Sequence, residues 1–338
     1  MTPVERERYS RQIRLEGIGD TGQDKLLQSH VSIVGCGALG SFQAGALARA
    51  GVGKLTLIDR DYVEVSNLQR QWLYDEKDVR DAVPKAVAAK SAISAFASTC
   101  DVNACTTDLT ARNIDDLLAG CDLILDGTDN FETRYLINDF SVLRNIPWIY
   151  GAAVGTYGLT FPVLPNVTTC LACIYPEPPA GVQPTCETAG VLGPLTSLVA
   201  SLQTASAIRI LTGNGVDPVI TTVNVWKNEI RQVRQGPKDP SCRACGLNQF
   251  IWLDVERISP VSLCGRNAVQ IHERHRPLDL RSLGESLRTL GEVRANDFAL
   301  RFFTAPYEIT VFPDGRAIIK GTQDIGLARS LYARYIGT

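Results

Sequence analysis

The sequence predicts an α/β fold: a Rossmann-like, doubly wound and mostly parallel sheet with a structural zinc site, followed by a small α+β domain. Three observations favour it. Strand-like and helix-like segments alternate from Val31 to about Tyr150, a glycine-rich turn follows the first strand, and acidic residues follow two later strands. Alternation of this kind is typical of βαβ units with helices on both faces of the sheet.

The elements follow from apolar periodicity and from turn signals. Residues 5–27 are expected to be helical, with one polar face. The segments that follow are a strand at 31–34, a helix at 38–50, a strand at 55–58, a helix at 85–96, a strand near 102–106, a helix near 114–118 and a strand at 123–125. Strands at 159–164 and 220–225 flank an apolar helix at 195–211.

The character of the chain changes after about Asn248. A strand at 268–272, a helix at 278–290, a hairpin formed by 307–312 and 316–320, and a last helix at 325–335 are expected there. About ninety residues lie within the usual lower range for a domain. We therefore predict a larger domain at 1–248 and a small α+β domain of unknown role at 249–338.

Composition narrows the class of protein. Apolar residues make up 45% and charged residues 21%, which is typical of a soluble globular chain. A net charge of -2 gives no reason to expect a nucleic-acid or membrane partner. The first residues lack the apolar core of a signal peptide, and the apolar stretch at 191–211 is too polar for a membrane span. We expect a cytoplasmic protein.

A glycine-rich turn predicts a nucleotide site. Gly35, Gly37 and Gly40 stand in a G-x-G-x-x-G pattern between a strand and a helix. Such a turn lets the backbone approach phosphates at a helix N-terminus, where free N–H groups favour an anion. Asp59, at the end of the second strand, is suited to accept hydrogen bonds from ribose hydroxyls. That role is the same for NAD and for ATP, so the glycine turn and Asp59 do not decide which of the two nucleotides binds.

The next polar cluster favours a triphosphate. Asn67, Arg70 and Gln71, followed by Lys85 at a helix start, supply fixed positive charge and polar groups where NAD would carry its adenosine ribose. The plain alternative is a solvated polar loop. An NAD-dependent oxidoreductase is the distant functional alternative, and it would leave Arg70 and Lys85 without a role.

Two carboxylates follow the strand at 123–125. The carboxyl ends of strands form the ligand crevice of an open α/β sheet, so Asp129 is a candidate ligand for Mg²⁺. Asp126 could instead only cap the helix that follows.

Ten cysteines include two C-x-x-C pairs, Cys170 with Cys173 and Cys242 with Cys245. Four thiolates so spaced suit a closed tetrahedral zinc site, the alternatives being reduced core cysteines or redox-active pairs. Cys186 lies in a loop before the apolar helix. Its thiol is either a nucleophile with a lowered pKa or an inert loop thiol.

Taken in order, these motifs resemble the ubiquitin-activating (E1-like) superfamily and, within it, the ThiF/MoeB/HesA-type sulfur-carrier adenylyltransferases. The resemblance runs from about Glu5 to Gly246. One departure is Ala82, two residues before Pro84, because the family usually has a glycine before this proline. The matching motifs are Tyr9-Ser10-Arg11-Gln12, the glycine turn, Asp59-x-Asp61, Ser66-Asn67-Leu68-Gln69-Arg70-Gln71, Lys85, Thr128-Asp129-Asn130 and the two cysteine pairs.

The resemblance implies ATP-dependent adenylation of the C-terminal glycine of a ubiquitin-like sulfur carrier, with ATP, Mg²⁺ and Zn²⁺ as cofactors. It implies a homodimer in which Arg11 reaches the partner's ATP, and a sulfur donor that is a cysteine desulfurase or a sulfurtransferase. The implied catalytic residues are Arg11, Arg70, Lys85, Asp129 and Cys186. The implied nucleotide-binding residues are Gly35, Gly37, Ala38, Gly40, Asp59, Asp61, Ser66, Asn67, Leu68, Gln69, Arg70, Lys85, Asp129 and Asn130.

The C-terminal extension at 307–337 resembles that of the longer thiamin-pathway members, so we expect a thiamin-type carrier. A molybdopterin-pathway or tRNA-thiolation carrier is the close alternative. A non-catalytic subunit of a heterodimeric activating enzyme would normally lack some of the ATP-binding residues, and here all of them are present.

Overall fold

The computed structural model describes residues 1–179, 188–254, 262–263, 267–271 and 277–337. The chain divides into two compact units, Met1–Val255 and Glu256–Thr338. The boundary expected from the sequence, at residue 248, falls inside the first unit. In the described part of the chain, no helix combines the length and the apolar character needed to cross a membrane.

The first unit is built on an eight-stranded sheet in the order β3-β2-β1-β4-β5-β6-β7-β8. Four of its seven neighbouring pairs are parallel, and the three pairs from β5 to β8 are antiparallel. The strands are β1 His30–Val34, β2 Lys54–Ile58, β3 Asp101–Cys105, β4 Leu123–Asp126, β5 Trp148–Val154, β6 Tyr157–Val163, β7 Val219–Asn224 and β8 Glu229–Arg234.

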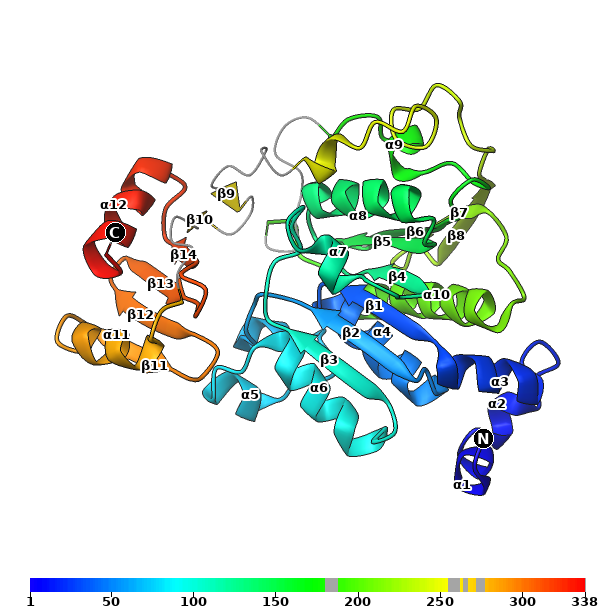
Figure 1. Ribbon diagram of the computed structural model, residues 1–338, viewed down its shortest axis with the longest axis horizontal. Coiled ribbons are helices and arrows are strands. Elements are labelled where there is room, and N and C mark those ends of the chain that lie inside the picture. The colour runs from blue at the N-terminus through cyan, green and yellow to red at the C-terminus, as the bar shows by residue number, and fades with distance from the viewer. Residues whose placement is uncertain (180–187, 255–261, 264–266, 272–276, 338) are drawn as a thin grey trace. The chain divides into compact units, whose positions relative to one another are not determined.

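Helices cover both faces of this sheet, so the doubly wound prediction is confirmed (Figure 1). Helices α4, α6 and α10 pack on one face, and α7 and α8 pack on the other. The helices of the unit are α1 Pro3–Arg8, α2 Ser10–Ile13, α3 Gly19–Gln28, α4 Ala38–Ala50, α5 Glu76–Arg80, α6 Lys85–Phe96, α7 Ile114–Leu117, α8 Phe131–Arg144, α9 Leu171–Ile174 and α10 Gly193–Thr212, with 3₁₀ turns η1 Val65–Asn67 and η2 Ile251–Leu253.

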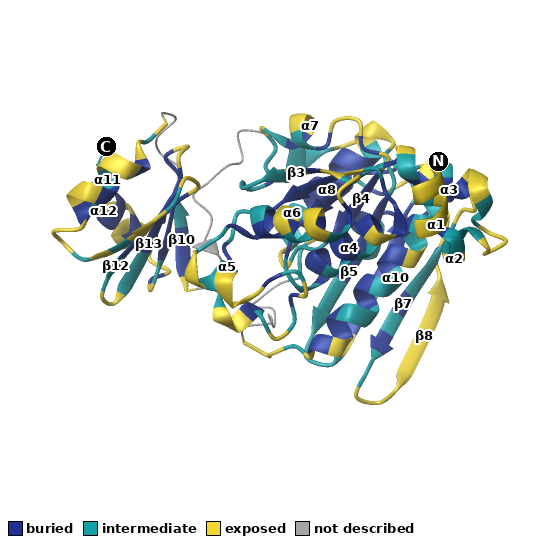
Figure 2. Ribbon diagram, turned by 90° about the horizontal axis from the view of Figure 1, so that it is seen from below, coloured by how far each residue is buried: buried dark blue, intermediate teal, exposed yellow. Residues whose placement is uncertain are grey.

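The central strands are mostly apolar because they are buried on both faces. In β4, Leu123 and Leu125 pack toward α4 and α6, whereas Ile124 packs toward α7 and α8. Successive side chains of a strand point to opposite faces, so a continuous apolar run suits a strand covered on both sides. Figure 2 shows this buried centre and, at one edge of the sheet, the exposed strand β8.

Several parts of the unit differ from the sequence prediction. The helix expected at 5–27 is divided into α1, α2 and α3, and Gly19, the first residue of α3, has a φ of 58°. Helices α5, α8 and α9 and strands β5 and β8 were not predicted. Helix α8 buries Arg134, Asn138 and Asp139, and polar residues on a buried face conceal the apolar period that marks a helix.

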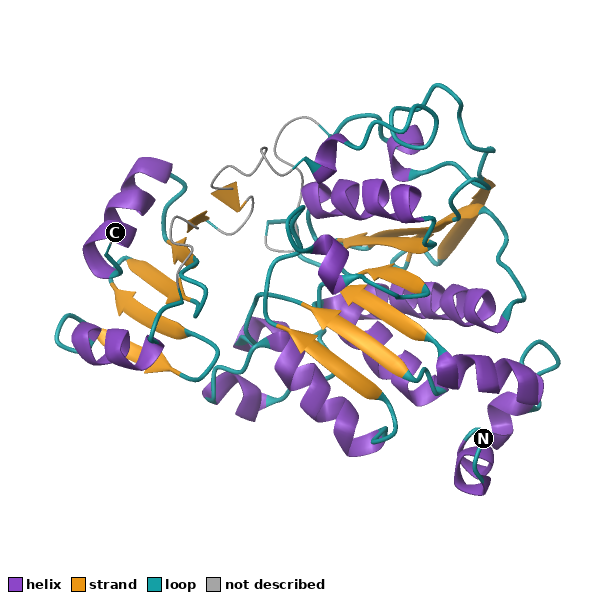
Figure 3. Ribbon diagram, in the orientation of Figure 1, coloured by secondary structure: helices purple, strands orange, loops and turns teal. Residues whose placement is uncertain are grey.

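The second unit confirms the expected small α+β fold. Its strands form one antiparallel sheet in the order β11-β12-β13-β14-β10-β9, and α11 and α12 contribute Leu280, Leu287 and Tyr332 to its core (Figure 3). The elements are β9 Ser262–Leu263, β10 Ala268–Ile271, α11 Leu280–Leu287, β11 Glu292–Ala295, β12 Leu300–Thr304, β13 Tyr307–Val311, β14 Ala317–Lys320 and α12 Ile325–Tyr335.

The structure shows why glycine would suit position 82, where this chain has alanine. Helix α5 ends in a Schellman motif, in which the Val83 N–H donates to the Asp78 carbonyl and the Ala82 N–H donates to the Val79 carbonyl. Ala82 therefore stands at the left-handed position, with a φ of 48°, where glycine is the usual residue.

We expect Ala82→Gly to stabilise the protein slightly. The left-handed conformation costs a residue with a Cβ roughly 1–2 kcal/mol, and the greater freedom of glycine in the unfolded chain offsets about 0.4–1 kcal/mol of the gain. The thermal melting temperature should rise by about 1–2 °C. The control Ala95→Gly, on the exposed side of α6, should lower it. A lower melting temperature for Ala82→Gly would contradict the strain argument.

Candidate functional site

The turn between β1 and α4 requires glycine on steric grounds. Gly35 has a φ of 85°, and a Cβ at this position would lie 2.6 Å from the Gly127 carbonyl oxygen. A Cβ on Gly40 would lie 1.8 Å from the Gly35 carbonyl oxygen. Helix α4 begins at Ala38 without a side-chain cap on its first turn. The turn thus presents backbone N–H groups at a helix start, as a phosphate site requires.

Asp59 anchors this turn from the end of β2. One carboxylate oxygen accepts the Cys36 N–H at 2.6 Å, and the other accepts the Asp61 N–H at 2.7 Å. Burial raises the pKa of Asp59, and the nearby ammonium of Lys85 opposes this shift. Each oxygen keeps a further lone pair, so the carboxylate remains suited to accept ribose hydroxyls.

Charged side chains pair beside Asp59. The Lys85 Nζ lies 3.1 Å from a carboxylate oxygen of Asp61, and the Lys85 side chain is 8% exposed. Arg60 contacts the other oxygen of Asp61 at 3.7 Å and binds Asp108 at 2.6 Å. The lysine predicted to bind phosphate therefore stands at the first residue of α6, with its ammonium held by an acidic neighbour.

The predicted phosphate loop packs against the glycine turn. Asn67 and Gln71 are buried, and the Gln71 Nε2 lies 3.9 Å from where a Cβ on Gly37 would stand. The Arg70 guanidinium donates to the Ser66 carbonyl at 2.8 Å, which folds the loop on itself. Tyr74, which no motif of the sequence indicated, donates its hydroxyl to the Cys36 carbonyl at 2.6 Å. Ser66 and Gln69 are exposed, and Leu68 packs partly into the core.

The loop after β4 completes this edge of the sheet. Asp126 is fully buried, and one of its carboxylate oxygens accepts both the N–H and the hydroxyl of Thr128, at 2.8 and 2.7 Å. Asp129 is exposed beside them. The backbone of Gly127 abuts Gly35, so Asp129 lies two residues from the glycine turn's contact point. The predicted nucleotide-binding residues therefore gather at the carboxyl ends of β1, β2 and β4.

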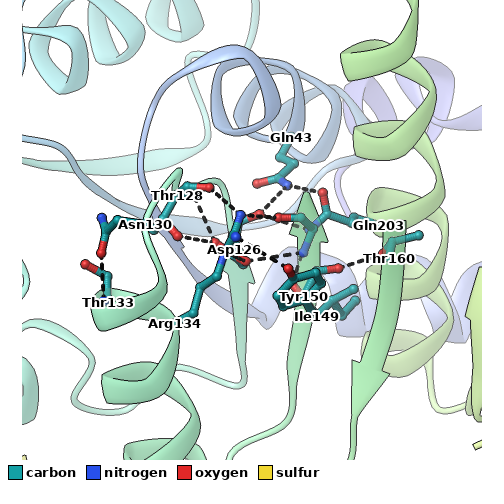
Figure 4. Close-up of polar contacts among 11 residues, drawn as sticks. Gln43, Asp126, Thr128, Asn130, Thr133, Arg134, Ile149, Tyr150, Thr160 and Gln203 are labelled. Atoms are coloured by element: carbon teal, nitrogen blue, oxygen red, sulfur yellow. Dashed lines mark hydrogen bonds and ion pairs between the residues drawn. The ribbon is translucent and has the colours of Figure 1, made fainter. Parts of the chain in front are cut away.

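The interpretation of Asp126 as a helix cap is wrong. The cap of α8 is Asn130, whose side-chain oxygen accepts the Thr133 N–H at 2.8 Å. Asp126 instead forms an ion pair with Arg134 at 3.0 Å, and both side chains are buried (Figure 4). Burial alone lowers the pKa of Arg134, but Tyr150 and Asp126 raise it overall, so the guanidinium stays charged. The sequence analysis did not single out Arg134. The signal that could have indicated it is its position four residues after Asn130, one turn into α8.

Arg11 is not brought to this site within one protomer. It is exposed on α2, where the neighbouring Gln12 donates to the carbonyl of Ala50 at the C-terminal end of α4. The glycine turn stands at the N-terminal end of the same helix. At 1.5 Å per residue, the 13 residues of α4 separate the two ends by about 20 Å.

The two C-x-x-C pairs form one cluster. The Sγ atoms of Cys170, Cys173, Cys242 and Cys245 all lie within 4.8 Å of one another. Three of the separations are 3.8 Å for Cys170 to Cys173, 3.7 Å for Cys170 to Cys242, and 3.4 Å for Cys173 to Cys245. Four sulfurs at 2.3 Å from a tetrahedral zinc ion stand about 3.8 Å apart, so this donor set fits zinc.

Polar residues of α8 hold the cluster in place. Asn138 accepts the Leu171 N–H at 2.8 Å and lies 3.7 Å from the Cys170 sulfur. Asp139 binds Arg243, between the second pair of cysteines, through two contacts of 3.1 Å. The cluster therefore joins the loop after β6 to the loop after β8.

Cys186 lies outside the described residues. Just beyond it, the Gly155 N–H donates to the Gly190 carbonyl and the Leu192 N–H donates to the Gly155 carbonyl, at 2.8 and 2.9 Å. These bonds tie the start of α10 to the turn between β5 and β6.

Comparison with known proteins identifies the family. Residues 9–244 match the ThiF family. The chain belongs to the ThiF family. It is 44% identical over 334 residues to the sulfur carrier protein ThiS adenylyltransferase of Bacillus subtilis, covering 98% of this chain and 99% of that one. It is 37% identical over 251 residues to a sulfur carrier protein adenylyltransferase of Thermus thermophilus, covering 71% of this chain and 92% of the relative.

Solved structures support the same fold. The crystal structure of Escherichia coli MccB with ATP covers 71% of this chain and 74% of its own, with a TM-score of 0.61 and 24% sequence identity. The likeness to this ThiF-type fold agrees with the mixed α/β sheet described above.

We expect the cysteine cluster to carry about one zinc ion per chain. Cys242→Ser should abolish this zinc and lower the melting temperature by several degrees, because a structural zinc ion contributes directly to folding. Metal content by mass spectrometry and thermal melting would measure both effects. The control Cys100→Ser, at a half-buried cysteine, should keep its zinc. Reduced wild-type protein without zinc would contradict the assignment.

Proposed function

We propose that this ThiF-family protein adenylates the C-terminal glycine of a ubiquitin-like sulfur carrier. The observation that carries the proposal is the meeting of an anion-binding glycine turn, a ribose-binding carboxylate, basic side chains and an exposed carboxylate at one edge of the sheet. An oxidoreductase would need Asp59 and the glycine turn, but not Lys85, Arg70 or Asp129. The relatives named as carrier adenylyltransferases support the same reading.

The chemistry asks for alignment rather than covalent catalysis. A carboxylate oxygen of the carrier attacks the α-phosphorus of ATP, the bond to the bridging oxygen breaks, and pyrophosphate leaves with that electron pair. The reactants are both anions, so the enzyme must hold them together and screen their charge. We assign screening to Arg70 and Lys85. Asp129 would hold Mg²⁺, which favours one or two carboxylates together with phosphate oxygens.

Arg11 enters this proposal through a second copy of the chain. Because Arg11 lies at the far end of α4 from the glycine turn, a contribution to catalysis has to come from a partner protomer. We propose a homodimer in which each Arg11 completes the site of the other subunit.

The adenylated carrier would then accept sulfur. We propose a thiamin-type carrier, because the relative that matches this chain over nearly its full length is named for ThiS. A molybdopterin-pathway or tRNA-thiolation carrier remains the alternative. Cys186 would link covalently to the carrier or relay sulfur from a cysteine desulfurase or sulfurtransferase, and we propose that the reaction takes place in the cytoplasm.

The test of adenylation is exchange of labelled pyrophosphate into ATP, with thiamin-type and molybdopterin-type carriers assayed separately. We expect exchange with the thiamin-type carrier and a loss of at least about 100-fold in Asp129→Ala, which lacks the proposed metal ligand. Asp115→Ala, at an exposed ion pair on α7, is the control and should behave as wild type. Failure of zinc-loaded, folded protein to catalyse exchange with either carrier would count against the proposal.

The test of the shared site is complementation between two inactive variants. Arg11→Ala and Lys85→Ala should each lose exchange when alone. After subunit mixing, a heterodimer contains one site with both residues, so about a quarter of the wild-type sites should be restored. Two copies of the same variant, unfolded and remixed in the same way, form the control. No recovery in a mixture shown by differential tagging to contain heterodimers would exclude a role for Arg11 across the dimer.

A further inference from the structure

A buried guanidinium lies directly behind the loop that carries Asp129. Arg134, on α8, is 5% exposed, and it donates to four acceptors in β4, in the loop after β4 and in β5 (Figure 4). The bonds are Nε to the Asp126 carboxylate at 3.0 Å, Nη2 to the carbonyls of Thr128 and Gly151 at 2.7 and 2.9 Å, and Nη1 to the Tyr150 hydroxyl at 3.4 Å.

This ion pair holds Thr128 at three points. Arg134 binds the Thr128 carbonyl, and Asp126 accepts both the N–H and the hydroxyl of the same residue. The Thr128 carbonyl belongs to the peptide that leads into Asp129. Fixing the plane of this peptide fixes the positions of the N and Cα atoms of Asp129, from which its exposed side chain leaves the backbone.

The end of β4 is also hydrogen-bonded to α4 and α10. Gln43, on α4, and Gln203, on α10, each donate to the carbonyl of Asp126, at 3.2 and 3.0 Å. The two amides also bind each other at 2.7 Å, and Gln203 donates to the carbonyl of Ile149 at 3.1 Å. Helix α4 starts at the glycine turn. The hydrogen bonds of Gln43 and Gln203 to Asp126 therefore help to set the distance between this turn and the loop that carries Asp129.

Stability alone is a weak reason to bury such a pair. Removing two charges from water costs about as much as their attraction returns, and apolar residues of similar volume often serve stability as well or better. Asp126 forms an ion pair with the guanidinium, and the charge of Asp129 also stabilises it from a greater distance. The small net gain in stability favours a role in geometry.

We propose that Arg134 is a positioning residue for adenylation: its guanidinium holds the Thr128 carbonyl and so positions the Asp129 carboxylate that would bind the Mg²⁺ of Mg·ATP. This inference rests on the proposed function in one respect, namely that Asp129 holds the metal.

The principal test is Arg134→Lys. Lysine keeps the charge but lacks the planar fork that reaches Asp126, Thr128 and Gly151 together. We expect kcat for pyrophosphate exchange to fall about 100-fold, as a misplacement of about 1 Å can cause, with less than a threefold change in the KM for ATP. The Mg²⁺ concentration at half-maximal rate should rise about tenfold. A raised KM with an unchanged kcat would overturn the proposal.

A double-mutant cycle separates positioning from general damage. The Asp129→Asn variant has no metal-binding carboxylate to position. Adding Arg134→Lys to this variant should therefore lower kcat for pyrophosphate exchange by less than about twofold. Independent losses that multiply in the double variant would show that Arg134 acts on something other than Asp129, and the proposal would fall.

Stability needs a matched control. Arg301→Lys alters a half-buried ion pair of the second unit, where Arg301 binds Glu308 at 2.7 Å, and should leave exchange kinetics and metal dependence unchanged. If Arg134→Lys does not fold, Thr128→Val removes only the hydroxyl bond to Asp126. It should shift kcat and the Mg²⁺ requirement in the same direction by a few-fold, and unchanged values would overturn the proposal.

A binding measurement keeps this inference distinct from the proposed function. Mn²⁺ affinity in the presence of ATP, followed by electron paramagnetic resonance without any carrier, should weaken about tenfold in Arg134→Lys. If wild type binds Mn²⁺ with ATP but exchanges with no carrier, the proposed function fails while the effect of Arg134→Lys on Mn²⁺ still decides the inference. Equal Mn²⁺ affinity in wild type and variant would overturn it.

Discussion

Direct backbone contact between the glycine turn and the end of β4 is the constraint on which the site depends. A Cβ on Gly127 would lie 2.4 Å from the Gly35 carbonyl oxygen, and a Cβ on Gly35 would lie 2.6 Å from the Gly127 carbonyl oxygen. No side chain fits between these segments. The Gly35 N–H donates to the carbonyl of Ile58 in β2, and the Gly127 N–H donates to the carbonyl of Val34 in β1. Each turn thus extends the hydrogen bonding between neighbouring strands by one residue. The glycine turn and the loop that carries Asp129 are therefore held at a fixed separation.

The strand order explains why the polar groups meet there. From β1 the chain adds β2 and β3 on one side, and then returns to add β4 and β5 on the other. Ligand sites of open α/β sheets lie where the order reverses, because the loops leaving the two central strands diverge. Asp59 follows β2, Asp129 follows β4, and Lys85 begins the helix after the intervening loop. Beyond β5 the sheet becomes antiparallel, and the cysteine cluster closes the loops of that half.

Much of the site was predictable because its signals are local. A strand, a glycine turn and a helix succeed one another within Val31–Ala50, and each C-x-x-C pair is four residues long. The same local signals failed for α8, where Arg134, Asn138 and Asp139 are buried against partners in β4, β5 and the cysteine loops. Local signals also failed for Asp126. A carboxylate a few residues before a helix can cap that helix or form a buried ion pair, and the sequence is the same in both cases.

The sequence by itself determined the sheet class, the glycine turn between a strand and a helix, and the two C-x-x-C pairs, since these depend on neighbours along the chain. Only the tertiary structure decided that Arg11 lies far from the site of its own protomer, that Asn130 rather than Asp126 caps α8, and that Arg134 supports the Asp129 loop. The physical reason is that a buried polar group must find its partners, and those partners come from distant segments that only folding brings together.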